Sequence, residues 1–132
     1  MKTTRVIVDN NVNKIRIYTQ AVEKLKLGEV VAFPTETVYG LGAIATNEQA
    51  VAKIFEAKGR PSDNPLIVHV GESQHILKYV SEVSKKAEKC IDAFWPGPLT
   101  LILHAKPNVF APNVTAGLST VGLRMPDHPV AL

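Results

Sequence analysis

The sequence predicts a protein of the α/β class, because strand-like and helix-like segments alternate along the chain. Short apolar runs that suit buried strands lie between longer segments whose apolar residues recur every three or four positions, as on one face of a helix. The 132 residues are 45% hydrophobic and 20% charged, which is ordinary for a globular domain. We therefore expect a single domain over residues 1–132.

Each predicted element is bounded by residues that begin or end such structure. In chain order, the elements are strand 5–9, helix 13–27, strand 29–33, helix 47–58, strand 66–70, helices 73–80 and 84–94, and strands 99–104 and 120–125. Gly28 ends the first helix, and Pro34 ends the next strand because proline cannot donate to a sheet ladder. Asn47 is a favoured N-cap for the second helix, and Gly59 favours its end.

Two later segments predict parts of the core. Residues Ala87, Cys90, Ile91 and Phe94 share one face of the helix 84–94, which indicates that this face is buried. Trp95 follows directly, in a Trp-Pro-Gly-Pro turn between helix and strand, and we expect its ring to fill the core there.

Composition and charge exclude several classes of protein. The one cysteine, Cys90, rules out an internal disulfide and a cysteine cluster for a metal. No apolar stretch approaches the roughly 18 residues of a membrane span, and the start of the chain lacks the apolar run of a signal peptide. We therefore expect a cytoplasmic protein without membrane contact. The net charge of +3 and pI near 9.1 suit anionic partners such as nucleotides or RNA, although most proteins of this balance bind neither.

The loop 34–42 follows a predicted buried strand, at the position where open α/β sheets bind ligands. The loop holds hydroxyls, the Glu36 carboxylate and two flexible glycines, and such a loop can bring backbone N–H groups and hydroxyls close to a small anion. The alternative is a plain turn whose hydroxyls cap backbone groups and whose Glu36 is a solvated charge. Gly40 and Gly42 also fit a dinucleotide-binding pattern weakly, but they lie too far past the strand, and the chain has no Walker-type phosphate loop.

Two cations flank a glycine at the end of the second predicted helix. Lys58 and Arg60 lead into a polar, proline-bounded turn that includes Asn64. A point charge and a planar guanidinium together suit a polyphosphate. The alternative is structural, because the negative end of the helix dipole attracts lysine and arginine anyway.

Two ionisable residues interrupt predicted apolar strands. His69 shares a strand face with Ile67, and it is either a packed residue or a donor that points into a site. Arg124 requires a partner, either protein or substrate, because a charge in an apolar strand is costly to leave unpaired. Thr120 lies four positions earlier and therefore on the same face.

Four motifs in one order resemble a known family. They are Pro-Thr-Glu-Thr-x-Tyr-Gly-Leu at 34–41, Lys-x-Arg-Pro with a polar turn and Pro-Leu at 58–66, Phe-Trp-Pro-Gly-Pro-Leu-Thr at 94–100, and Arg-x-Pro-x-His-Pro at 124–129. On these motifs the chain resembles the YrdC family of threonylcarbamoyl-AMP synthases over about residues 28–132, as the N-terminal portion of such a protein. The resemblance implies a YrdC-like twisted mixed sheet flanked by helices.

The resemblance also implies an ATP-consuming reaction, in which L-threonine, bicarbonate and ATP give threonylcarbamoyl-AMP and pyrophosphate. A downstream tRNA threonylcarbamoyl-transferase complex would then modify adenosine 37 of tRNA. Carried over from the motifs, the L-threonine ligands would be Thr37, His69 and Arg124, and the ATP ligands Lys58, Arg60, Asn64 and Thr120. Lys58 and Arg60 would also be catalytic, because they would offset charge on the pyrophosphate, with Mg²⁺ held through phosphate oxygens.

The family pattern continues past the last residue of this chain. Family domains are longer, and their Ser-x-Asn element would lie beyond Leu132, while residues 127–132 resemble the opening of a helix. We therefore expect a domain truncated at its C-terminus, with exposed apolar surface and no activity by itself. The alternatives are an RNA-binding module of the same fold, a carbamoyl-adenylating domain that shares the ATP chemistry, and an inactive fragment.

Overall fold

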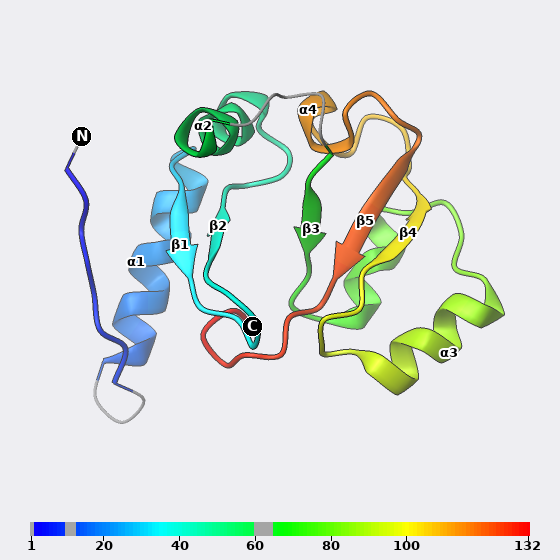
Figure 1. The fold of residues 1–132 in the computed structure, drawn as a ribbon, viewed down its shortest axis with the longest axis horizontal. Helices are drawn as coiled ribbons and strands as arrows, with labels where there is room; N and C mark the ends of the chain where they lie inside the picture. The colour runs from blue at the N-terminus through cyan, green and yellow to red at the C-terminus, as the bar shows by residue number, and fades with distance from the viewer. Residues whose placement is uncertain (1, 10–12, 60–64) are drawn as a thin grey trace.

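The structure, a computed structural model that describes residues 2–9, 13–59 and 65–132, confirms the α/β class (Figure 1). Its elements are α1 (Lys14–Lys26), β1 (Val31–Phe33), β2 (Gly40–Gly42), α2 (Glu48–Lys58), β3 (Ile67–His69), the 3₁₀ helix η1 (Ser73–Lys78), α3 (Lys85–Phe94), β4 (Leu101–His104), α4 (Pro112–Thr115) and β5 (Thr120–Arg124). None of the helices in these described ranges has the length and apolar character needed to cross a membrane.

The strands form two sheets. β1 and β2 make an antiparallel pair, and β3, β5 and β4 make a mixed sheet in which β5 is central. β5 runs parallel to β3 and antiparallel to β4. Figure 1 shows α1 next to β1 at one side of the molecule and α3 beyond β4 at the other. The mixed sheet flanked by helices is the architecture that the sequence resemblance implies.

The core lies on one face of the mixed sheet. Val68 of β3 and both Val121 and Leu123 of β5 are buried there, together with Ile76 of η1 and Ile91 of α3. Successive side chains of a strand point to opposite faces, so the remaining residues of β3 and β5 point to the other face. That second face is not covered by the core helices. It carries His69, Thr120 and Arg124, which the sequence analysis proposed as site residues.

The helix α2 begins and ends where the sequence predicts. The Asn47 side chain accepts the backbone N–H groups of Gln49 and Ala50 at 3.0 and 3.2 Å. Gly59 ends the helix with φ of 63°, a left-handed conformation that costs glycine little. The buried face of the helix consists of Ala50, Val51, Ile54 and Phe55.

Some predicted elements differ in the structure. Residues 5–9 form no strand, because no described segment pairs with them, and the Ile7 side chain is 83% exposed. The predicted helix 73–80 is the 3₁₀ helix η1. On α3 only two residues of the expected face are buried, so the prediction was wrong for Phe94, which is 59% exposed, and for Cys90, which is half-buried. Residues 127–132 make one turn, in which Leu132 donates to the carbonyl of His128 at 3.0 Å.

Candidate functional site

The open face of the mixed sheet carries three of the nominated site residues. His69 of β3 and Arg124 of β5 are partners in the parallel register, so their side chains start from neighbouring positions on the same face. Thr120 lies on this face at the beginning of β5. Ile67 and Ile102 lie on it as well, with 52% and 72% of their surface exposed. The open face therefore combines polar side chains with exposed isoleucine side chains.

The guanidinium of Arg124 is held by two other segments. Its Nε donates to the carbonyl of Gly97 at 3.1 Å, and its Nη2 forms an ion pair with Oε1 of Glu36. Only 12% of the Arg124 side chain and 21% of the Glu36 side chain are exposed. Glu36 is therefore the protein partner that an arginine in an apolar strand requires. The interpretation of Glu36 as a solvated loop charge is wrong.

The Trp-Pro-Gly-Pro turn shapes the contact with Arg124. The N–H of Gly97 donates to the carbonyl of Met125 at 2.8 Å, which fixes the turn beside the end of β5. A Cβ atom at Gly97 would lie 2.6 Å from the carbonyl oxygen of Phe94, so a larger residue would displace the turn. Trp95 is buried, as predicted, and its Nε1 donates to the carbonyl of Leu99 at 2.9 Å.

The loop between β1 and β2 lies against the segment that follows β5 (Figure 1). Oε2 of Glu36 accepts the backbone N–H of Asp127. Within the loop, Oγ1 of Thr35 accepts the N–H of Thr37 at 3.2 Å, donates to the carbonyl of Val38 at 2.6 Å and lies 3.0 Å from Oγ1 of Thr37. Thr35 thus caps the turn, while Thr37 is exposed. Thr37 directly follows Glu36, the residue that pairs with Arg124.

His69 packs against the β1–β2 pair. Its ring meets the Phe33 ring edge to face, with centroids 5.7 Å apart and planes at 77°. Cβ atoms at Gly40 and Gly42 would lie 3.0 and 2.9 Å from the Phe33 ring, so these glycines leave room for that ring. The glycine pair belongs to strand β2 and not to a dinucleotide-binding turn. Partial burial lowers the pKa of His69, which favours the neutral imidazole with one donor and one acceptor.

We expect the stability of the chain to depend on pH through His69. The unfolded chain binds a proton at this histidine more readily than the folded chain does. The free energy of unfolding therefore decreases as the pH falls below the ordinary histidine pKa of about 6.5. Urea unfolding at about pH 7.5 and about pH 6 should therefore show a larger loss of stability in the native sequence than in His69→Gln. An equal loss in both proteins would contradict this assignment of the pKa shift.

The structure describes one of the two cations that the sequence analysis assigns to ATP. Lys58 is the last residue of α2 and is exposed, whereas Arg60 and Asn64 lie outside the described residues. Figure 1 shows α2 near the end of the molecule where β3 begins, and β5 runs toward the opposite end. The described ranges also contain no group of three or more histidine, cysteine, aspartate or glutamate residues that could hold a metal ion.

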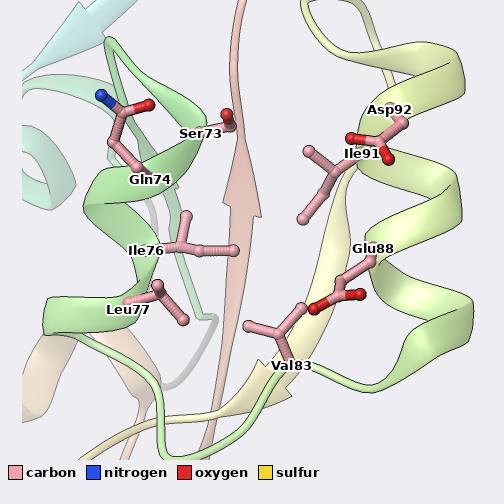
Figure 2. Close-up of a pocket in the computed structure, with 8 residues that line it drawn as sticks. All are labelled: Ser73, Gln74, Ile76, Leu77, Val83, Glu88, Ile91 and Asp92. Atoms are coloured by element: carbon pink, nitrogen blue, oxygen red, sulfur yellow. The ribbon is translucent and has the colours of Figure 1, made fainter.

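A hollow lies on the helical side of the mixed sheet. It is a cleft of about 210 Å³ between η1 and α3 (Figure 2). Its floor is apolar, and the carboxylates of Glu88 and Asp92 lie at its rim on α3. The lining residues are Ser73, Gln74, Ile76, Leu77, Val83, Glu88, Ile91 and Asp92. None of the nominated residues lines this cleft, so it is separate from the site on the open face.

Sequence comparisons agree with the four motifs. Residues 23–132 match the family Sua5_yciO_yrdC, which is described as Telomere recombination. The chain is 55% identical over 136 residues to the threonylcarbamoyl-AMP synthase of Bacillus subtilis and 52% identical over 119 residues to that of Pyrococcus abyssi. These alignments cover 100% and 90% of this chain but only 39% and 34% of the two relatives.

A comparison of structures gives the same relationship. The crystal structure of P. abyssi Sua5 complexed with L-threonine superposes with a TM-score of 0.84 and 49% sequence identity. The match covers 90% of this chain and 34% of that protein. Because the family match extends over most of the sequence and the structural match over nearly all of it, the chain belongs to the Sua5/YciO/YrdC family.

Proposed function

We propose that this chain supplies the L-threonine site, and part of the ATP site, of a protein that makes threonylcarbamoyl-AMP from L-threonine, bicarbonate and ATP. The observation that carries the proposal is that His69 and Arg124 are register partners in the parallel strands β3 and β5, on the open face of the sheet. Support comes from the similarity to P. abyssi Sua5, which was crystallised with L-threonine. The product would serve threonylcarbamoyladenosine modification of tRNA at position 37, through a separate transferase complex.

The charges and hydrogen-bonding groups of these side chains suit L-threonine. The guanidinium of Arg124 suits the amino-acid carboxylate, because arginine and carboxylate form charge-assisted, often bidentate hydrogen bonds. The neutral imidazole of His69 and the exposed hydroxyl of Thr37 can each donate and accept a hydrogen bond. These two groups therefore suit the amine and the hydroxyl of threonine. Thr120, at the other end of the open face, is proposed to contact ATP.

The proposed reaction needs little covalent help from the protein. The amine of threonine attacks bicarbonate with loss of water, the resulting carbamate oxygen attacks the α-phosphorus of ATP, and pyrophosphate leaves. Positioning of the reactants and neutralisation of charge supply most of the acceleration in such reactions. Lys58, Arg60 and Asn64 are proposed to bind the phosphates, and Mg²⁺ bound through phosphate oxygens would offset their charge.

The test is a comparison of this chain with the B. subtilis relative. We expect calorimetric titration to show that the chain binds L-threonine more tightly than L-valine, which lacks the hydroxyl. We expect pyrophosphate release with threonine, bicarbonate and ATP from the relative and far less from the chain. Failure to prefer L-threonine over L-valine would overturn the proposed site. Comparable pyrophosphate release by both proteins would instead show that the chain contains a complete active site.

A further inference from the structure

The Glu36 carboxylate connects the loop between β1 and β2 with the C-terminal end of β5. One oxygen pairs with Nη2 of Arg124, and the other accepts the N–H of Asp127 just beyond β5. The same residue belongs to the loop that carries Thr37. A single side chain therefore joins the loop to the end of the central strand.

The contacts of Arg124 leave one edge of its guanidinium for a ligand. Nε is engaged by the carbonyl of Gly97, and Nη2 by Glu36. Within the described ranges, no hydrogen bond or ion pair engages Nη1. A guanidinium has five N–H donors in a fixed plane, so two contacts on one side set the direction of the remaining donors.

The surroundings of this pair strengthen its electrostatic effect. Both side chains are largely buried, with exposed fractions of 12% for Arg124 and 21% for Glu36, and such pairs are screened less than surface pairs. Removing the carboxylate would leave the guanidinium short of a charged partner, and the Nε contact with Gly97 alone would orient it less firmly. The loop would also lose its connection to Asp127.

We propose that Glu36 is a positioning residue for L-threonine: it orients the Arg124 guanidinium and holds the Thr37 loop beside it, without contacting ATP. This inference rests on the proposed function, because it assigns Arg124 and Thr37 to the threonine site. A rival role would be a plug that occupies Arg124 until the threonine carboxylate displaces it. The two roles predict opposite effects on threonine affinity when Glu36 loses its charge.

The experiment is a calorimetric titration of Glu36→Gln with L-threonine and, separately, with ATP. We expect threonine to bind on the order of tenfold more weakly and ATP to bind as in the native sequence. Glu29→Gln is the matched control, because Glu29 pairs with Lys24 at 3.4 Å on the surface, where about half of each side chain is exposed. That variant should bind both ligands as the native sequence does.

Further variants keep the test decisive. Glu36→Asp retains the charge on a shorter side chain and should restore part of the threonine affinity. Circular dichroism of each variant will show whether the fold is retained. If the native chain binds threonine and Glu36→Gln binds it equally or more tightly, the positioning role is overturned and the proposed function stands. If the native chain does not bind threonine, the proposed function fails, and the positioning role of Glu36 fails with it.

Discussion

Replacing Arg124 with alanine is expected to weaken L-threonine binding by about 10- to 150-fold, which corresponds to about 1.5–3 kcal/mol for lost hydrogen bonds to a charged group. The loss arises because the Arg124 guanidinium is proposed to bind the threonine carboxylate, next to His69 on the open face. ATP affinity should change far less, since Arg124 is not among the residues proposed to bind the phosphates. Calorimetric titrations with the two ligands separate these effects.

The Arg124 variant needs a control for its effect on the fold. Alanine at this position also leaves the Glu36 carboxylate without its ion-pair partner. Arg124→Lys keeps a positive charge but lacks the planar fork, so we expect an intermediate threonine affinity. Unchanged threonine affinity in a folded Arg124→Ala protein would remove Arg124 from the proposed site.

The largest expected effect on stability comes from Leu123→Ala. Leu123 lies in the central strand β5, has no exposed surface and belongs to the core on the helical face of the mixed sheet. Truncating a buried leucine removes apolar burial and leaves a cavity, which costs about 2–5 kcal/mol of unfolding free energy. Urea denaturation would measure this loss directly.

Leu118→Ala provides the matched control, because the same atoms are removed from a side chain that is 57% exposed. Substitutions at such positions usually change stability by no more than about 0.5 kcal/mol. Similar losses in the two variants would contradict the assignment of Leu123 to the centre of the core.

The sequence predicted those elements whose boundaries depend on local chemistry. Asn47 and Gly59 set the limits of α2 through a cap and a left-handed residue, and both act within a few residues of themselves. Strand β2 was missed, because Gly40 and Gly42 are poor strand formers and pair there with β1 beneath the ring of Phe33. The expected strand 5–9 failed for a related reason, since a strand depends on a partner that its own residues do not specify.

At the candidate site, the sequence predicted which strand residues share a face but not which side chains they contact. The strand patterns placed Thr120 and Arg124 on one face and required a partner for the arginine, and the structure bears out both points. The identity of that partner was not predictable, because Glu36 lies in a distant loop and nothing in its local sequence indicates an ion pair. The roles of Arg60 and Asn64 stay predictions, since these residues lie outside the described part of the chain.

The parallel pairing of β3 with β5 also has a consequence for the order in which the chain folds. These strands are separated in sequence by η1, α3, β4 and α4, so their contact closes a long loop. Contacts of this kind form slowly, because the entropy of loop closure must be lost before the contact compensates for it. His69 and Arg124 therefore become neighbours only when β5 has entered the sheet, and partly folded chains without β5 in place would lack the proposed threonine site.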